Sequence, residues 1–240
     1  PEPYSVKTDW FEMNEAVLQL RPYQNPIVPV AVASVESPAG VTLAGKHGAS
    51  VLSLSVPRDT IRKTSLAELW SIAEETAAVH GKEMHREDWG VVMGMHLADT
   101  KEQAFKDIRE GSARVVTEYF GQTLGNPTPD VPRDQIVDYM VDHNQWIVGT
   151  PDDCIAGIER LQEISGGFGK FMIPVEDWAP RDKIHRSYEL LARYVMPHFQ
   201  GSVQGIEISR DWASERREAL QANRYVGIKS ATDRFDAGRK

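Results

Sequence analysis

Residues 33–40 place two serines and a glycine between an apolar run and the start of a helical pattern. The segment reads ASVESPAG and contains Ser34, Ser37 and Gly40. Serine hydroxyls and the free N–H groups of a helix N-terminus donate hydrogen bonds, and the helix dipole favours negative charge there. Gly40 has no Cβ, so the backbone can approach a ligand closely. The segment predicts a phosphate-type anion site, and a plain turn whose serine only caps the helix would use the same residues.

His96 is the residue best suited to act as an acid or base, because histidine exchanges protons near neutral pH. It lies near the end of the apolar run 91–97, which reads VVMGMHL and also contains Met95. Binding groups of parallel α/β folds lie at the carboxyl ends of strands. We therefore expect Met95 and His96 to line a substrate pocket, although a lone histidine is more often structural. No other catalytic residue is identified.

Trp178 is a third pocket candidate, because it follows the apolar run 170–175 together with Glu176 and Asp177. An aromatic wall and an exposed surface position are both compatible with this sequence. Cys154 is the only cysteine, which excludes an intrachain disulfide and a multi-cysteine metal site. Its helical surroundings predict a buried thiol rather than a nucleophile.

No metal site is predicted. Histidines and carboxylates that bind metals recur at short, fixed spacings. The following histidines lack such a spacing: His80, His85, His143, His185 and His198. The glycine-rich run 166–169 precedes an apolar run instead of following one, so it predicts a tight turn away from the active face.

The composition indicates a small-molecule partner. The 240 residues carry a formal net charge of −8, and 41% of them are hydrophobic. An acidic chain neutralises nucleic-acid phosphates poorly, so no nucleic-acid partner is expected. No apolar run approaches the roughly 18 residues of a membrane span, and the N-terminus lacks the features of a secretory leader. With one cysteine, a cytoplasmic protein is expected, and the start at Pro1 without Met predicts a preceding segment.

The elements that position these residues alternate between strands and helices. Continuous apolar runs predict parallel strands, the first of them covered on both faces, over 27–34, 51–55, 91–97 and 170–175. Helices are predicted over 38–48, 65–81, 100–121, 150–165 and 182–199. Ser65 with Glu68, and Thr100 with Gln103, have the spacing of a capping box, and Gly48 suits the position after a helix end.

Three segments fall outside this alternation. Residues 4–20 predict a short two-stranded excursion. Residues 122–148 contain three prolines and no sustained period, which predicts a long excursion with a short helix around 134–142. Residues 200–240 form a charged extension that is expected to pack on the body made by residues 1–199.

Four strands, each followed by a helix, leave two fold classes open. A complete (β/α)₈ barrel needs eight such pairs, so the chain would supply half of one. An open four-stranded α/β sheet has the same pattern. Half a barrel exposes two edge strands and an apolar sheet face, which predicts pairing with another copy in a homo-oligomer.

Several stretches carry a family likeness, in order along most of the chain to about His198. They read TDWFEMNEAVLQLRPYQ, PVAVASVESPAGVTLAGKHGASVLSLS, MGMHLADTKEQA and GTPDDCIAGIERLQEISGGFG, followed by EDWAP. Together they resemble the bacterial-luciferase-like flavin monooxygenases, and the limonene monooxygenase type in particular. The resemblance implies a (β/α)₈ barrel of which this chain forms the C-terminal half, strands five to eight.

The resemblance also implies a cofactor and its binding residues. Reduced FMN, supplied by a separate flavin reductase, would react with O₂ to oxygenate a small terpene-like or cyclic substrate. The family's phosphate loop corresponds to Ser34, Val35, Glu36, Ser37 and Gly40. Glu36 is an anion near an anion site, so its backbone would serve, and the arginine that clamps the phosphate would belong to the other half of the barrel.

Two further interpretations stay open. A deazaflavin (F420)-dependent oxidoreductase uses the same fold and phosphate loop. A non-catalytic flavin-binding or assembly module would use the half-barrel alone. The family often places a mobile lid in the region of residues 122–148, and a plain excursion fits their composition equally.

Overall fold

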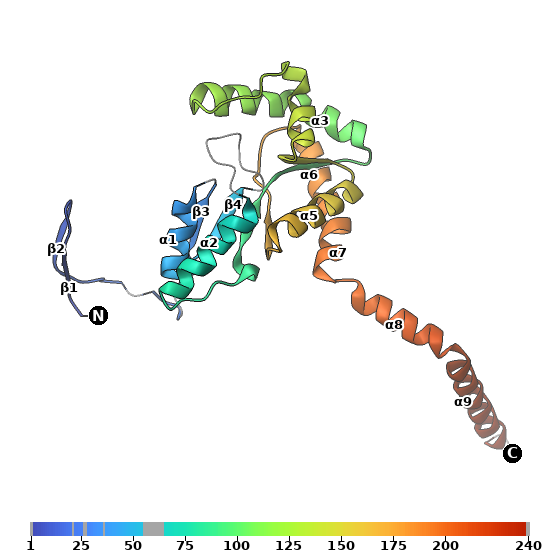
Figure 1. Cartoon of the computed structure of the whole chain (residues 1–240). Coiled ribbons are helices and arrows are strands. Elements are labelled where there is room, and N and C mark those ends of the chain that lie inside the picture. The colour runs from blue at the N-terminus through green and yellow to red at the C-terminus, as the bar shows by residue number, and fades with distance from the viewer. Residues whose placement is uncertain (1, 21, 26–27, 36, 55–64, 239–240) are drawn as a thin grey trace. The chain divides into compact units, whose positions relative to one another are not determined.

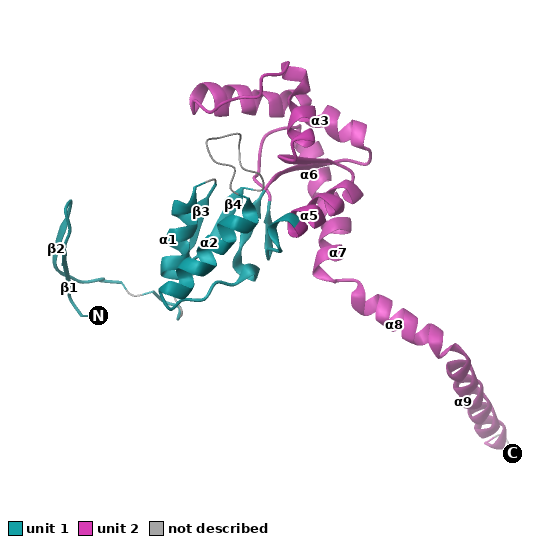
Figure 2. Ribbon diagram, viewed as in Figure 1, with its two compact units in different colours: residues 1–92, 164–172 teal, residues 93–163, 173–240 magenta. Residues whose placement is uncertain are grey.

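The computed structural model describes residues 2–20, 22–25, 28–35, 37–54 and 65–238. The chain divides into two compact units, coloured separately in Figure 2. Unit 1 comprises residues 1–92 and 164–172, and unit 2 comprises residues 93–163 and 173–240. Each unit has its own parallel strands and its own buried residues.

Unit 1 contains a four-stranded sheet in the order β3-β4-β5-β8. The strands are β3 (Ala31–Ser34), β4 (Ser50–Leu54), β5 (Gly90–Val92) and β8 (Lys170–Met172). All neighbouring strands pair in parallel, which confirms the predicted α/β class with a parallel sheet. The ends of the predicted strands at residues 27 and 55 lie outside the described residues.

The sheet of unit 1 has one well-buried face. Along β4, Val51 and Ser53 are buried, while the alternate residues Ser50, Leu52 and Leu54 are half-buried. On β3, Ala31 and Ala33 are exposed, so the predicted burial of both faces is wrong for this strand. The physical reason is that α1 and α2 pack against each other and α1 packs on β3 and β4, which covers one side.

The two helices of unit 1 begin and end at the predicted signals. The first, α1 (Pro38–His47), is followed by Gly48, which adopts the left-handed backbone with φ 65°. The second, α2 (Leu66–Val79), begins at Ser65, and the predicted capping box with Glu68 is confirmed. Figure 1 shows the two helices beside β3 and β4. Local start and stop chemistry therefore sets this part of the fold.

Two tryptophans and an arginine anchor the start of β5 within unit 1. Trp70 and Trp89 stack with ring centroids 4.8 Å apart, and the guanidinium of Arg86 lies 5.1 Å from the Trp70 ring. Arg86 Nη1 donates a 2.9 Å hydrogen bond to the carbonyl of Gly167. The predicted tight turn at 166–169 is confirmed by positive φ at its first two glycines. Arg86 therefore ties this turn to the aromatic pair.

The N-terminal segment forms a hairpin. Strands β1 (Tyr4–Lys7) and β2 (Glu12–Ala16) pair antiparallel, which confirms the predicted two-stranded excursion.

Unit 2 contains a separate two-stranded parallel sheet. Its strands are β6 (Gly94–Leu97) and β7 (Trp146–Gly149), and every residue of both is buried. The prediction of one continuous strand over 91–97 is wrong, because the chain breaks at Met93. Residues before Met93 pair within the sheet of unit 1, and residues after it pair with β7. A single apolar run thus supplies two strands in two sheets.

The region 122–148 is more regular than its composition predicts. The helix α3 (Lys101–Arg114) continues as a π-helix over Val115–Thr123, and α4 (Ile136–Asp142) follows a 3₁₀ turn over Arg133–Gln135. The predicted helices around 100–121 and 134–142 are confirmed. Reading 146–149 as part of a loop is wrong, because these residues form β7 and pair with β6.

Side chains fix α4 onto α3. Arg109 Nη1 on α3 lies 2.8 Å from Asp138 Oδ2 on α4. Arg133, in the 3₁₀ turn before α4, pairs with two glutamates. Its Nη2 lies 2.9 Å from Glu110 Oε1, and its Nη1 lies 3.3 Å from Glu118 Oε1. The core of unit 2 lies beneath these pairs and includes the buried Ile108, Ile136, Val137, Trp146, Val148 and Trp178.

The remaining helices follow in order along the chain. They are α5 (Pro151–Ser165), α6 (Arg181–Leu190), a π-helix over Leu191–Val195, α7 (Met196–Gln200), α8 (Gln204–Glu215) and α9 (Arg217–Ala237). These confirm the predicted helices at 150–165 and 182–199. No residue of α8 or α9 is buried, and packing of the 200–240 extension on the body stays a prediction. Among the described helices, none has the length and apolarity to cross a membrane.

Candidate functional site

The predicted anion loop lies between β3 and α1. Ser34 ends β3 with 3% of its surface exposed, and its Oγ donates a long hydrogen bond of 3.4 Å to the carbonyl of Ser37. Val35 is exposed at 40%. Glu36 lies outside the described residues. The buried serine and the exposed valine therefore frame a turn that bends from the sheet toward solvent.

The start of α1 lacks the side-chain cap that its N-cap serine could supply. Ser37 occupies the N-cap with an extended backbone, φ −94° and ψ 147°, yet its side chain makes no capping hydrogen bond. Pro38 fills the first helical position, and no acidic residue occupies the first turn. The N–H groups of a first helical turn have no acceptor within the helix. An anion at this end would meet unpaired donors and the positive end of the helix dipole.

Gly40 lets this helix start lie directly against the end of β3. A Cβ at this position would come 2.9 Å from the carbonyl oxygen of Ala33 and 2.9 Å from the Cβ of Ser34. Both distances are shorter than side chains tolerate, so any larger residue would push the first turn away from the strand. The glycine thus fixes the position of the free N–H groups relative to Ser34.

His96 lies on β6 and faces α3. Its side chain is 4% exposed, and its Nε2 lies 3.6 Å from Oδ2 of Asp107, beyond hydrogen-bond distance. The other carboxylate oxygen of Asp107 accepts a hydrogen bond from Gln103. Burial lowers the pKa of His96 from its ordinary value of 6.5, and Asp107 partly opposes this effect. The ring is therefore held neutral inside unit 2.

Met95 and Cys154 form a sulfur contact in unit 2. Met95 is 7% exposed, and Cys154 Sγ lies 3.8 Å from Met95 Sδ. Burial raises the pKa of the Cys154 thiol to about 12. The expected buried thiol is confirmed, because a thiol with this pKa carries almost no thiolate at neutral pH.

Trp178 is buried in the core of unit 2, with 7% of its surface exposed. Its ring lies 4.3 Å from that of Trp146 at an angle of 38°. A Cβ on Gly94 would come 2.5 Å from the Trp178 ring, and one on Gly111 would collide with the Trp178 carbonyl. Two glycines from β6 and α3 thus make room for this tryptophan. Glu176, two residues earlier, is half-buried.

A solved structure shares the fold. The oxygenating constituent of 3,6-diketocamphane monooxygenase from Pseudomonas putida, in complex with FMN, matches 82% of this chain and 58% of its own, with a TM-score of 0.63 at 19% identity. At that identity the likeness concerns the fold alone. No family model matches the chain.

Curated relatives are closer in sequence. The 4-hydroxyprotoasukamycin monooxygenase of Streptomyces nodosus subsp. asukaensis is 41% identical over 224 residues, which cover 92% of this chain and 60% of the relative. Limonene 1,2-monooxygenase of Rhodococcus erythropolis is 40% identical over 203 residues, which cover 84% of this chain and 51% of the relative. In sequence the chain is similar to these two monooxygenases, and in fold it is similar to the FMN-bound solved structure. It spans between half and two thirds of the length of these relatives.

The predicted site residues fall into two groups. Ser34, Val35, Ser37 and Gly40 lie in unit 1. Met95, His96 and Trp178 lie in unit 2, where Trp178 contacts Gly94, the residue before Met95. The strand that pairs within the sheet of unit 1 ends at Val92. The carboxyl-end argument that selected His96 therefore applies to residues 93 and 94 instead.

Two glycines of this region were not predicted to be important. Gly94 and Gly111 accommodate Trp178. A glycine inside an apolar strand pattern signals a bulge or a close approach of another group. The glycine in VVMGMHL carried that signal for both the strand break and the tryptophan contact. Gly111 lies inside an ordinary helical pattern and gave no comparable signal.

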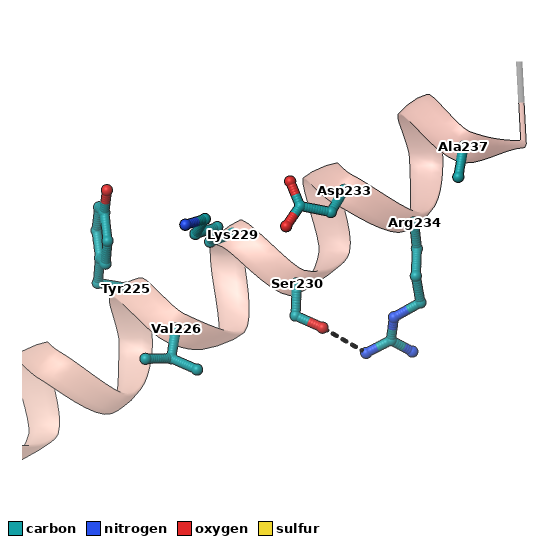
Figure 3. Close-up of a pocket in the computed structure, with 7 residues that line it drawn as sticks. All are labelled: Tyr225, Val226, Lys229, Ser230, Asp233, Arg234 and Ala237. Atoms are coloured by element: carbon teal, nitrogen blue, oxygen red, sulfur yellow. Dashed lines mark hydrogen bonds between the residues drawn. The ribbon is translucent and has the colours of Figure 1, made fainter.

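A hollow on the C-terminal helix lies apart from both groups of residues. A shallow hollow follows one side of α9 and is lined by Tyr225, Val226, Lys229, Ser230, Asp233, Arg234 and Ala237 (Figure 3). All of these residues come from a single exposed helix, where Arg234 donates a 3.0 Å hydrogen bond to Ser230. Within the described part of the chain, no group of three or more metal-binding side chains gathers.

Proposed function

We propose that this chain provides the flavin-phosphate end of a flavin-dependent monooxygenase that oxygenates a small terpene-like or cyclic organic molecule. A separate flavin reductase would deliver reduced FMN, and the bound reduced FMN would supply the chemistry that activates O₂. The observation that carries the proposal is the start of α1, where the side chain of the N-cap Ser37 makes no hydrogen bond to the first-turn N–H groups. The enzyme would work in the cytoplasm as a homo-oligomer.

The residues between β3 and α1 fit a phosphate group. The N–H groups of the first helical turn and the Ser37 hydroxyl would donate hydrogen bonds to it, and Ser34 would add a second hydroxyl from a buried position. Val35 and the backbone of Glu36 would complete the loop. Gly40 would hold the donors against the strand end. The arginine that clamps the phosphate in the family has no assigned counterpart, so we expect moderate affinity.

The chain would form strands five to eight of a (β/α)₈ barrel through β3, β4, β5 and β8. The parallel order of these strands supports this proposal, as does the apolar face left uncovered by α1 and α2. On that face Met172 is 39% exposed. A further four strands would have to come from more polypeptide or from another copy, because apolar barrel interiors are normally filled by side chains from all eight strands.

The substrate pocket would include Met95, His96 and Trp178. In this proposal Trp178 and Met95 contribute apolar surface, and His96 would hold or release a proton near the substrate. The burial of all three side chains means that a change in the packing of unit 2 would have to accompany substrate binding.

A comparison of FMN with riboflavin tests the phosphate site directly. The two flavins differ only by the phosphate, so fluorescence titrations of the purified chain with each ligand isolate its contribution. We expect FMN to bind at least about ten-fold more tightly, which corresponds to about 1.4 kcal/mol. Equal affinities would contradict a phosphate site. Tight binding of the deazaflavin F420 without binding of FMN would favour the deazaflavin-dependent alternative.

Oxygen uptake tests the reaction. The chain is mixed with a flavin reductase, NADH and limonene, the compound named in one relative, and O₂ consumption and oxygenated product are measured. Product that depends on the flavin and on this chain would support the monooxygenase. Flavin binding without any product, also with other cyclic terpenes, would favour a non-catalytic flavin-binding module.

A further inference from the structure

The C-terminal helices α8 and α9 expose large apolar side chains to solvent. Ile208 and Trp212 of α8 are exposed, as are Leu220 and Ile228 of α9. Among the described residues of these two helices none is buried. Most helical stability in proteins comes from packing of an apolar face, and a helix of 12 residues such as α8 is marginal by itself in water. The two helices together, residues 204–237, are called the arm below.

One face of α8 combines apolar and acidic side chains. Ile208, Asp211, Trp212 and Glu215 follow the spacing i, i+3, i+4 and i+7, which places them on one side of the helix. Each of the two carboxylates pairs with an arginine directly next to it in the sequence and remains more than half exposed. Such surface pairs contribute little to stability, so these carboxylates can take another cationic partner at small cost.

One face of α9 combines apolar and basic side chains. Arg217, Leu220, Arg224 and Ile228 follow spacings of three, four and four residues, which also keep to one side of a helix. Val226 points elsewhere, because two residues are about 200° apart on a helix, and it lines the hollow drawn in Figure 3. The face of α9 therefore carries the charge that is opposite to that on the face of α8.

The two faces match in charge and in apolarity when the helices run antiparallel. This alignment places three pairs side by side: Asp211 with Arg224, Ile208 with Ile228, and Trp212 with Leu220. A parallel alignment that begins at the same end would instead set Ile208 against Arg217 and Asp211 against Leu220. Charged pairs beside an apolar contact are what sets the partner and the direction of paired helices.

A single copy cannot bring these two faces together. Two antiparallel helices need a connecting loop of about two to five residues. Here Arg216 alone separates the end of α8 at Glu215 from the start of α9 at Arg217. Pairing within one chain would therefore require several residues of either helix to unwind. A second copy offers the same two faces without that cost.

We propose that the arm is an interaction surface for a second copy of this chain, in which α8 of each copy lies antiparallel on α9 of the other. The two contacts are related by a two-fold axis near Arg216, as in an isologous dimer. The interface lies in unit 2 and is therefore distinct from the sheet of unit 1. It goes beyond the proposed function, because it does not depend on flavin chemistry.

Sedimentation velocity of the full chain tests the interface. We expect the native chain to sediment as a dimer. Ile228→Glu should weaken the dimer by about ten-fold or more, because a charge replaces an apolar side chain at the centre of a contact. Val226→Glu is the matched control. It introduces the same charge on the same helix, away from the contact, and should leave the dimer unchanged.

A charge exchange tests the pairing itself. Asp211→Arg sets two arginines against each other at both contacts, and Arg224→Asp sets two aspartates against each other, so each variant should weaken the dimer about ten-fold. An equimolar mixture of the two variants should restore it, because every arginine at these positions then faces an aspartate. Restoration by mixing requires contact between copies, and a repaired fold within one chain does not produce it.

Three results would overturn the inference. A native chain that sediments as a monomer contradicts the dimer and favours packing of the extension on its own body. Equal effects of Ile228→Glu and Val226→Glu contradict the assigned face, and a mixture that stays as weak as its components contradicts the pairing. The FMN titration on the same samples reports separately on the proposed function. A dimer that does not distinguish FMN from riboflavin contradicts that function and leaves the arm interface supported.

Discussion

Two of the turns that lead from a parallel strand into a helix can be compared directly: residues 34–38 between β3 and α1, and residues 97–101 between β6 and α3. Both place a hydroxyl residue at the N-cap. At the second turn, Thr100 accepts a hydrogen bond from the N–H of Gln103. At the first turn, Ser37 makes no capping bond. Similar residues at similar positions therefore leave different groups unpaired.

Several polar groups of the second turn find partners within unit 2. The N–H of Leu97 donates a 2.8 Å hydrogen bond to Ser187, and Asp99 lies 2.6 Å from Arg186. The first turn has an exposed Val35 and a serine bonded only at 3.4 Å. Groups that are fully paired stabilise the fold, whereas unpaired donors at a helix start are available to a ligand. We therefore propose that the first turn serves binding and the second serves stability.

Gly40→Val is expected to have the largest effect. The added side chain would collide with Ala33 and Ser34 and push the first turn of α1 off the strand. We expect FMN affinity to fall by roughly ten-fold or more, with a loss of about 1–3 kcal/mol in the free energy of unfolding from overpacking. Flavin fluorescence and urea denaturation measure the two effects. Gly227→Ala in α9, where a Cβ meets open space, is the control and should leave FMN affinity unchanged.

Thr100→Ala is expected to affect stability alone. It removes the 3.2 Å capping bond to Gln103 and should lower the free energy of unfolding by about 1 kcal/mol. FMN affinity should stay the same. Thr232→Ala is a suitable control, because this threonine bonds only the carbonyl of Ile228 within the exposed α9. If Thr100→Ala weakened FMN binding as strongly as Gly40→Val, the division between the two turns would be wrong.

Ser37→Ala should show the reverse pattern. No capping bond is lost, so the free energy of unfolding should change by less than about 0.5 kcal/mol, as for most surface substitutions. FMN affinity should fall about five-fold if the hydroxyl donates to the phosphate, and riboflavin affinity should not change. Ser71→Ala, in the exposed part of α2, controls for the loss of a serine in the same unit. A stability loss as large as that of Thr100→Ala would mean that Ser37 is a cap after all.

Much of this architecture was predictable because it depends on local chemistry. The capping box at Ser65, the left-handed Gly48 and the helix start at Thr150 are each set by residues within a few positions. Backbone groups at helix ends must find acceptors or donors nearby, and the side chains that supply them leave a sequence signal. The helices and the parallel class of the strands followed from such signals and from the apolar runs.

The pairing of the strands was not predictable in the same way. The glycine in the run 91–97 signals an irregularity, but nothing in the pattern tells that the residues before it pair with β4 and the residues after it with β7. Strand β7 has only four residues, which is too few for an alternating pattern that would distinguish a strand from a loop. Pairing is decided by contacts between residues far apart in the sequence, which local patterns do not contain.

The same difference between local and distant contacts decides which parts of the candidate site were predictable. The loop at residues 34–40 follows from one strand, one helix start and a glycine, all adjacent in sequence. The burial of Trp178 depends on Gly94 and Gly111, which come from other elements. Its neighbour Glu176 is half-buried, and the sequence alone does not distinguish it from the exposed Asp177.

The smallest expected effect is a pH dependence of the free energy of unfolding that arises from His96, on β6 just before the second turn. Burial lowers the folded-state pKa of His96 below the ordinary value of 6.5 that holds in the unfolded chain. The unfolded chain therefore binds a proton more readily, so stability should be complete above about pH 6.5 and should fall as pH decreases through the folded-state pKa. Asp107 on α3 partly offsets the cost of the charge and keeps the effect small.

Urea denaturation at pH 8 and pH 5.5 measures this dependence. In His96→Gln the titrating ring is absent, so the loss of stability between the two pH values should be smaller than in the native chain. His47→Gln changes an exposed histidine of α1 and should leave the loss unchanged. FMN affinity, measured at both pH values, should not follow His96 if its ring serves only the fold. A pH dependence of FMN binding that disappears in His96→Gln would instead show that His96 affects flavin binding. That result would contradict the proposal that only the first turn serves binding.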